Sequence, residues 1–219
     1  MLLDLAHTLA EYAVCGEGNV SHRQSDKTFL VKASGSSLHN LTESDLTLCN
    51  LSGDKINPKH KKPSIETLFH AWIMKQFPEI NYISHTHPTH TNKILCTDHI
   101  YSFANNRLFP DQIVRNGKKS CVVPYATPGK KLLVELVRSV NNFIDIEGYF
   151  PKLILLQNHG IIAASAVQKE CIASTIMCEK SAEIFIGAVN LGKCNFLDSE
   201  SIDEIFDCPN EKYREEILK

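Results

Sequence analysis

The chain has 219 residues, of which 43% are hydrophobic and 22% charged. This is the composition of an ordinary globular protein and excludes a disordered chain. A formal net charge of −2 argues against general nucleic-acid binding, which needs surplus basic residues to neutralise phosphates. The length suits one large domain, since roughly 150 residues per domain is a reasonable prior.

No apolar stretch approaches the roughly 18 residues that indicate a membrane-spanning helix, so we expect no membrane segment. The chain begins Met-Leu-Leu-Asp, with no basic region ahead of its apolar residues, which is unlike a secretory signal. None of the eight cysteines belongs to a CxxC pair. We therefore expect reduced thiols in a cytoplasmic protein.

Hydrophobic periodicity predicts helices and strands in irregular alternation. Helices are predicted over residues 3–14, 64–77, 89–96, 130–144 and 167–191. Strands are predicted over residues 28–33, 46–51, 80–87, 120–124, 152–157 and 161–164. Loops are predicted at 16–21, 34–37 and 105–116. This pattern favours an α/β fold, a single domain with a mixed or largely antiparallel central sheet flanked by helices.

The clearest candidate for chemistry is the pair His85 and His87, at the end of a predicted strand. Residues two apart in a strand point to the same face, so both imidazoles project together. Protonation of two imidazoles this close together is unfavourable, because the two positive charges repel each other. A divalent cation, in contrast, can be coordinated by both lone pairs. The alternative is a pair of polar residues at a strand end, each bonded to the backbone.

A third histidine, His159, follows another apolar strand and precedes Gly160. It lies far from His87 along the chain, so only the fold could bring the two together. Three neutral imidazoles with one or two open positions would form a catalytic site of the zinc type. The alternative for His159 is a lone, hydrogen-bonded histidine at a strand end.

The sequence Pro-Ser-Ile-Glu at residues 63–66 precedes a predicted helix. Ser64 is a natural N-cap, and free amides at a helix start attract anions such as phosphate. Glu66 falls in the first turn, where the helix dipole favours a carboxylate. Plain capping is the alternative for both. His70 would share the helical face of Glu66, either as its partner or as a half-buried surface histidine.

Two small, polar stretches, residues 16–21 and 33–37, expose backbone amides that could approach an anion. Neither is followed by GK[ST] as in a Walker loop, and neither fits GxGxxG. Each stretch alone is also typical of a simple turn.

Together these segments resemble the class II aldolase and adducin superfamily of sugar-phosphate enzymes. The resemblance rests on GEGNVS, ASGS, PSIET, SHTHP, VVPYATPG and LLQNHG, which occur in this order between residues 5 and 192. It implies a class II aldolase-like domain over residues 1–192 and a C-terminal tail, 193–219, at a subunit interface. It also implies a cytoplasmic homotetramer with active sites between subunits.

The resemblance further implies roles for individual residues. His85, His87 and His159 match three zinc-binding histidines. Glu66 matches a carboxylate that acts as general acid and base and can bind the metal when substrate is absent. The substrate phosphate would be held by Gly18, Asn19, Ser34, Gly35 and Ser64. The cofactor would be one Zn²⁺ per subunit, although such a site also accepts Mn²⁺, Fe²⁺ or Co²⁺.

The reaction implied is reversible cleavage of a ketose phosphate to dihydroxyacetone phosphate and an aldehyde, through a metal-stabilised enediolate. Epimerisation, dehydration or decarboxylation of a sugar phosphate on the same scaffold are alternatives. So is a non-catalytic, adducin-like binding module. Glu66 favours an aldolase over an epimerase, which usually has aspartate there, and adducin-type heads are not expected to keep the metal ligands.

The sequence departs from the family pattern at two points. Ile65 stands where many aldolases have a second phosphate-binding serine. The tyrosine that donates a proton in some aldolases has no secure match, and its nearest candidates are Tyr101, Tyr125 and Tyr213.

Overall fold

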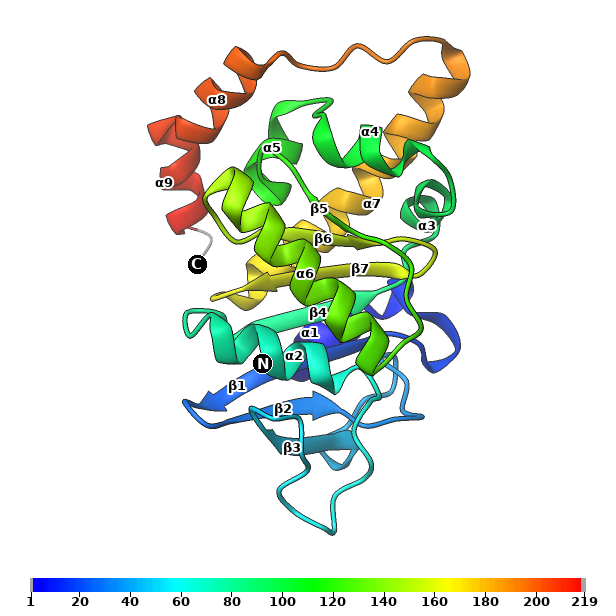
Figure 1. The fold of residues 1–219 in the computed structure, drawn as a ribbon, viewed down its shortest axis with the longest axis vertical. Helices are drawn as coiled ribbons and strands as arrows, with labels where there is room; N and C mark the ends of the chain where they lie inside the picture. The colour runs from blue at the N-terminus through cyan, green and yellow to red at the C-terminus, as the bar shows by residue number, and fades with distance from the viewer. Residues whose placement is uncertain (1, 218–219) are drawn as a thin grey trace.

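The computed structural model describes residues 2–217 and is built on a seven-stranded sheet (Figure 1). The strands are β1 (Asn19–Ser25), β2 (Thr28–Lys32), β3 (Leu46–Asn50), β4 (Tyr82–Thr86), β5 (Cys121–Val123), β6 (Leu153–Leu156) and β7 (Gly160–Ser165). Their order across the sheet is β3-β2-β1-β4-β7-β6-β5. All neighbours pair antiparallel except β5 and β6, which are parallel. The predicted single-domain α/β fold with a largely antiparallel sheet is therefore confirmed.

Helices cover both faces of this sheet. They are α1 (Leu2–Thr8), α2 (Thr67–Gln76), α3 (Thr89–Leu95), α4 (His99–Asn105), α5 (Pro110–Asn116), α6 (Lys130–Glu147), α7 (Gln168–Leu191), α8 (Ser199–Asp207) and α9 (Pro209–Ile217). Helices α2 and α6 lie in front of the sheet in Figure 1, and α1 and α7 lie behind it. Across residues 2–217, none of these helices combines the length and apolar character needed to span a membrane.

The alternation of side chains along the strands divides the core into layers. In β6, Ile154 and Leu156 pack in the cluster that includes residues of α2 and α6. Leu153 and Leu155 pack on the opposite face with residues of α3, α4 and α7. All four side chains are buried, which explains why this strand is apolar throughout instead of alternating with polar residues.

The structure differs from the predicted elements at several points, and helices α4, α8 and α9 were not predicted at all. Residues 19–25 form β1 near the middle of the sheet. The sequence pattern predicts a loop over residues 16–21 and no strand before residue 28. The stretch 105–116 is not wholly a loop, because α5 begins at Pro110 in the favoured first helical position. The predicted helix over residues 3–14 ends at Thr8 and continues as two short 3₁₀ turns.

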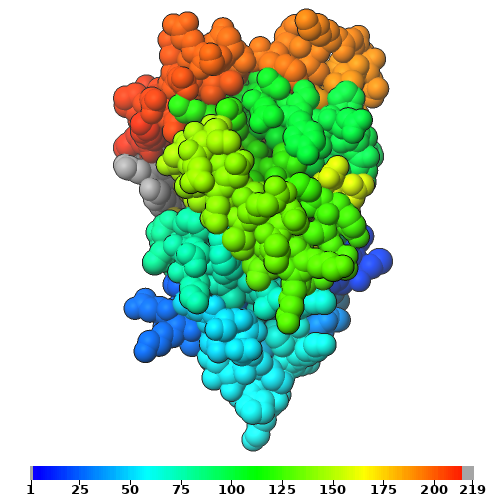
Figure 2. Space-filling model, viewed as in Figure 1, coloured from blue at the N-terminus to red at the C-terminus, as the bar shows by residue number. Residues whose placement is uncertain are grey.

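The C-terminal segment runs from the end of α7 across the top of the molecule in Figure 2. It is anchored at Lys118, whose Nζ lies 2.6 Å from Asp203 of α8 and 4.8 Å from the ring centre of Phe206. The outer ends of the predicted ranges 1–192 and 193–219, residue 1 and residues 218–219, lie outside the described residues.

Candidate metal centre

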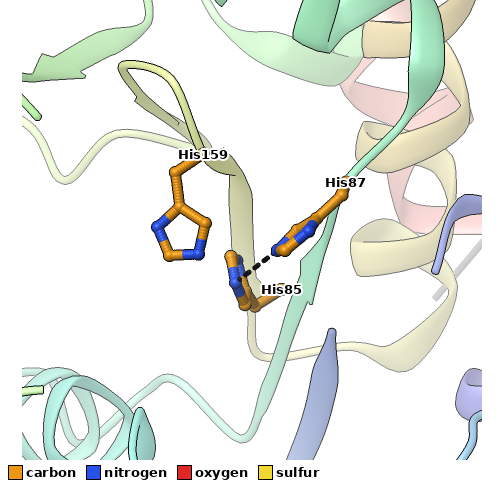
Figure 3. Close-up of side chains that lie close together, drawn as sticks. All are labelled: His85, His87 and His159. Atoms are coloured by element: carbon orange, nitrogen blue, oxygen red, sulfur yellow. Dashed lines mark hydrogen bonds between the residues drawn. The ribbon is translucent and has the colours of Figure 1, made fainter. Parts of the chain in front are cut away.

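The structure brings His85, His87 and His159 together at one end of the sheet. His85 is the fourth residue of β4 and His87 follows the end of that strand. Because β4 pairs with β7, with Thr86 opposite Ile161, the turn before β7 carries His159 to the same place. Figure 3 shows the three rings pointing at one another. Their possible ligand atoms all lie within 4.8 Å of one another.

Gly160 makes this convergence possible. A Cβ atom there would lie 2.5 Å from both the His87 ring and the Thr86 carbonyl oxygen. These distances are too short for any side chain, so the turn approaches the end of β4 closely only because residue 160 is glycine. The residue before His159, Asn158, has a φ of 55°, a left-handed conformation that asparagine tolerates better than most residues.

The hydrogen bonds of His85 and His87 at Nδ1 determine that Nε2 of each ring faces the centre of the cluster. His85 Nδ1 lies 2.9 Å from the carbonyl oxygen of Ile161, and His87 Nδ1 lies 2.9 Å from Glu17 Oε2. Both partners accept hydrogen bonds, so the protons belong on Nδ1. When both rings are neutral, the Nε2 lone pairs of His85 and His87 face each other at 3.0 Å. This arrangement is repulsive without a cation and suits a bound divalent metal.

Glu66 brings a carboxylate to the same centre. It is buried at the start of α2, with Oε2 3.3 Å from His85 Nε2 and Oε1 3.1 Å from His159 Nε2. Ser64 is not the N-cap of this helix as predicted, because α2 begins at Thr67 with Glu66 in the cap position. Ser64 Oγ instead accepts the backbone N–H of Glu66 at 3.3 Å.

Burial and mutual charge shift the pKa values of this cluster in opposite directions. Burial disfavours the ionised form of Glu66, but His85 and His159 outweigh it and hold its pKa well below the usual range. Burial likewise opposes the charged form of His85, and Glu66 outweighs it, raising the His85 pKa. For His87, burial and the charge of His85 lower the pKa to about 3. The carboxylate is therefore ionised and His87 neutral near pH 7.

A buried chain of hydrogen bonds holds Glu66 in place. Asn19 Nδ2 donates to Glu66 Oε2 at 2.8 Å. The Asn19 side-chain oxygen bonds to Nε2 of His70, whose Nδ1 lies 2.7 Å from Ser21 Oγ. His70 is completely buried. His70 is therefore a buried residue that supports the site through Asn19, and not a half-buried surface histidine.

The five residues expected to hold phosphate lie on three neighbouring segments. Ser64 Oγ is 3.4 Å from Asn19 Nδ2, and the Ser34 N–H donates to the Lys62 carbonyl at 2.8 Å. Gly35 has a φ of +81° and, within the described chain, no atom within 4 Å of where a Cβ would stand. Gly18 is the opposite case, because a Cβ there would lie 2.8 Å from the His85 carbonyl oxygen.

Lys32, which the sequence pattern did not single out, lies at the end of β2 and is only 3% exposed. Its Nζ donates to the Gly16 carbonyl at 3.0 Å. Burial lowers its pKa, while the negative charge of Glu66 opposes that shift. A buried cation beside the proposed anion loops is a candidate for binding an acidic substrate. The only sequence signal was a charge at the end of an otherwise apolar strand.

The tyrosines considered as proton donors are all exposed. Tyr101, Tyr125 and Tyr213 have 53%, 59% and 63% of their surface accessible. Their contacts within one chain do not single out one of them, so the role stays unassigned.

Comparisons with known proteins agree with this architecture. The family model described as "Class II Aldolase and Adducin N-terminal domain" matches residues 4–186. A 3-oxo-tetronate 4-phosphate decarboxylase from Haemophilus influenzae is 30% identical over 177 residues, which is 80% of this chain and 79% of the relative. A methylthioribulose-1-phosphate dehydratase from Xylella fastidiosa is 36% identical over 95 residues, or 39% of this chain and 43% of the relative.

Solved structures share the fold at lower sequence identity. YgbL from Escherichia coli superimposes with a TM-score of 0.79 and 22% identity, covering 94% of this chain and 96% of that one. An L-fuculose 1-phosphate aldolase superimposes with a TM-score of 0.80 and 23% identity, covering 97% and 94%. With the family model spanning most of its length, the chain belongs to the class II aldolase and adducin family.

Proposed function

We propose that this protein is a metal-dependent lyase that breaks a carbon–carbon bond in a phosphorylated keto sugar or its acid. The observation that carries the proposal is the position of the Glu66 carboxylate, 3.3 Å from His85 Nε2 and 3.1 Å from His159 Nε2. A proton-transferring group and a triple imidazole cluster thus share one centre. A binding module without catalysis would need neither.

Decarboxylation of a 3-oxo sugar acid phosphate is the first candidate reaction. The relative from Haemophilus influenzae, which aligns with 80% of this chain, is named for that reaction. Loss of CO₂ from 3-oxo-tetronate 4-phosphate leaves a three-carbon phosphorylated ketone, dihydroxyacetone phosphate. Aldol cleavage of a ketose phosphate gives the same product, so aldolase activity is the second candidate. Both reactions leave an electron pair on the carbon beside the ketone.

The proposed ligands are His85, His87 and His159, with Glu66 as a fourth when no substrate is bound. We favour Zn²⁺, and Mn²⁺, Fe²⁺ or Co²⁺ also suit this donor set. When bound, the cation supplies Lewis-acid stabilisation of the negative charge that develops on the substrate oxygens.

Glu66 is the proposed acid–base group. Its low pKa means that it starts as a carboxylate, so it first accepts a proton from the substrate or solvent. It then delivers that proton to the carbon left by bond cleavage. Asn19 Nδ2, 2.8 Å from Oε2, keeps the carboxylate aimed at the centre during this transfer.

The substrate phosphate is proposed to lie against Gly18, Asn19, Ser34, Gly35 and Ser64. The Asn19 side chain already serves Glu66 and His70, which leaves its backbone and the neighbouring loops for the phosphate. Lys32 adds a cation near these loops. Because Ile65 replaces a serine, backbone amides carry more of the phosphate binding than hydroxyl groups do.

We further propose that residues 1–192 form the catalytic domain of a cytoplasmic homotetramer, with 193–219 at a subunit interface. Ile65, Tyr125 and Val134 are 64%, 59% and 64% exposed. A Cβ on Gly129 would lie 3.3 Å from Ile65, so the loop after Tyr125 lies beside the segment that carries Glu66. Large apolar side chains exposed there suit contact with another subunit. Light scattering coupled to size exclusion tests the tetramer.

The experiment begins with metal analysis of protein purified without chelator, where close to one divalent ion per chain is expected. The loaded protein is then incubated with 3-oxo-tetronate 4-phosphate, and CO₂ and dihydroxyacetone phosphate are measured. A parallel reaction supplies dihydroxyacetone phosphate with a panel of aldehydes. Ketose phosphate formation without CO₂ release would favour the aldolase. A metal-free chain that is inactive in both assays would contradict the lyase proposal.

A further inference from the structure

Among the three proposed ligands, His87 has the most exposed side chain, and its outer ring nitrogen, Nδ1, faces a charged group. Its side chain is 16% accessible, against 0% for His85 and 13% for His159. Its Nδ1 lies 2.9 Å from Oε2 of Glu17, whereas His85 uses the neutral carbonyl of Ile161. The carboxylate of Glu17 has no assigned role in the proposed reaction.

The Glu17 carboxylate is fixed by its own loop, independently of His87. Its Oε1 accepts the backbone N–H of Val14 at 3.1 Å, and the Glu17 N–H donates to the Val14 carbonyl at 3.1 Å. The next residue, Gly18, is pressed against β4, because a Cβ there would lie 2.8 Å from the His85 carbonyl oxygen. The loop therefore presents Oε2 to His87 from a prearranged position.

The same loop also holds the backbone of His87. The His87 N–H donates to the Tyr12 carbonyl at 2.7 Å. Residues 12–18 thus form hydrogen bonds with the His87 main chain and with its outer ring nitrogen, Nδ1. Two contacts of this kind define both where the ring stands and how it is rotated.

We propose that Glu17 is a positioning residue for the metal centre: its carboxylate accepts a hydrogen bond from the Nδ1–H of His87 and so directs Nε2 at the ion. This inference rests on the metal site of the proposed function. The hydrogen bond fixes the tautomer with the proton on Nδ1 and the lone pair on Nε2. The negative charge of the acceptor makes the ring a stronger donor to a cation, as carboxylate partners of metal-bound histidines do.

Glu17 thus orients the most exposed of the three ligand side chains. His85 is completely buried in the sheet, with the edge of the Phe69 ring against it. Among residues 2–217, His159 Nδ1 has no hydrogen-bond partner. Loss of Glu17 would leave His85 as the one ligand of the three whose ring is oriented through Nδ1.

The test is metal affinity, measured by competition with a chromogenic chelator for Zn²⁺ in the full-length protein. Glu17→Gln keeps the size of the side chain and an acceptor oxygen but removes the charge. Glu17→Ala removes the contact entirely. We expect Glu17→Ala to bind Zn²⁺ about 10–100-fold more weakly than the wild type, with Glu17→Gln between them. The absorption bands of the Co²⁺-loaded protein should change in the same order.

Glu183→Gln is the matched control, because Glu183 is an exposed glutamate of α7 and does not belong to residues 12–18. Its affinity should equal that of the wild type. Glu17→Ala binding Zn²⁺ within about twofold of the wild type would overturn the inference. If Glu17→Ala fails to fold, Glu17→Gln binding Zn²⁺ as tightly as the wild type would overturn it instead. A wild-type chain that binds no metal would instead overturn the proposed function.

Discussion

At the scale of single residues, the three histidines were predictable and their supporting contacts were not. His85 and His87 share a strand face by the period of two, and His159 lies in a motif that resembles the same family. Nothing in the sequence links Glu17 to His87 or Asn19 to Glu66. Those contacts cross between strands and loops far apart in the chain, so only the register of β1 against β4 creates them.

Glu66→Gln should separate proton transfer from metal binding. The three imidazoles remain, so the variant should retain close to one metal ion per chain. Loss of a general acid–base group typically lowers the rate about 10²–10⁴-fold. Exchange of solvent deuterium into dihydroxyacetone phosphate measures the step directly. Glu79→Gln, at an exposed residue, is the control, and undiminished exchange in Glu66→Gln would contradict the assigned role.

His70 should make the metal-free protein sensitive to acid. Burial, then the charge of His85, lower the pKa of His70 to about 3 from an ordinary value of 6.5. Between these values the unfolded chain takes up a proton that the folded chain refuses. The stability contributed by His70 is therefore fully present above about pH 6.5 and is lost as the pH falls toward 3.

Urea unfolding of metal-free protein between pH 4 and 7 tests this dependence. As the pH falls, the free energy of unfolding of His70→Asn should decrease less steeply than that of the wild type. The two slopes should differ by up to about 1.4 kcal/mol per pH unit. His39→Asn, at an exposed histidine, should leave the wild-type slope unchanged. Parallel curves for wild type and His70→Asn would show that His70 is not the group responsible.

At the scale of elements, strands with apolar sequences were predicted and polar ones were not. β1 contains Val20 as its one clearly hydrophobic residue, yet it lies between β2 and β4. Its backbone hydrogen bonds are supplied by both neighbours, so tertiary pairing overrides a sequence that is typical of a loop. α5 was missed because seven residues are too few for periodicity to identify a helix.

Gly160→Ala should disrupt the hairpin between β6 and β7 and the metal centre with it. The added Cβ would lie 2.5 Å from both the His87 ring and the Thr86 carbonyl oxygen, so the turn must move away from β4. We expect loss of Zn²⁺ affinity by at least about tenfold, as for other disturbed ligand settings, together with a lower melting temperature.

Gly187→Ala is the matched control for this substitution. Gly187 lies within α7, and in the described part of the chain no atom stands within 4 Å of its added Cβ. Alanine in a helix interior should stabilise the protein by up to about 1 kcal/mol and leave metal affinity unchanged. Equal metal affinity of the two alanine variants would contradict the role given to Gly160.

At the scale of the whole molecule, the candidate centre joins three parts of the fold. The end of β4, the turn before β7 and the start of α2 meet there. The fold class was predictable because strand and helix patterns alternate over the whole chain. The order of the strands was not, since pairings such as β1 with β4 depend on contacts that no local pattern encodes.

Removal of the metal should lower the stability of the entire domain. An ion present at about 100 times its dissociation constant stabilises the folded state by about 2.7 kcal/mol. For a chain of this size, chelation should lower the melting temperature by roughly 5–10 °C, as measured by differential scanning calorimetry. The melting temperature of His159→Ala should not change when chelator is added, because this variant lacks one of the proposed ligands. A metal-loaded wild type that melts at the same temperature after chelation would contradict the coupling.

The order of the strands also determines when the proposed metal site can form during protein synthesis. β1 to β4 leave the ribosome first and form a continuous half of the sheet, β3-β2-β1-β4. His159, residue 159 of 219, is made only after β5 and β6. Until β7 arrives, β4 is an open edge that could pair with another nascent chain. Loading of the proposed metal would therefore be a late maturation step, and the growing chain would have to avoid aggregation without help from an ion.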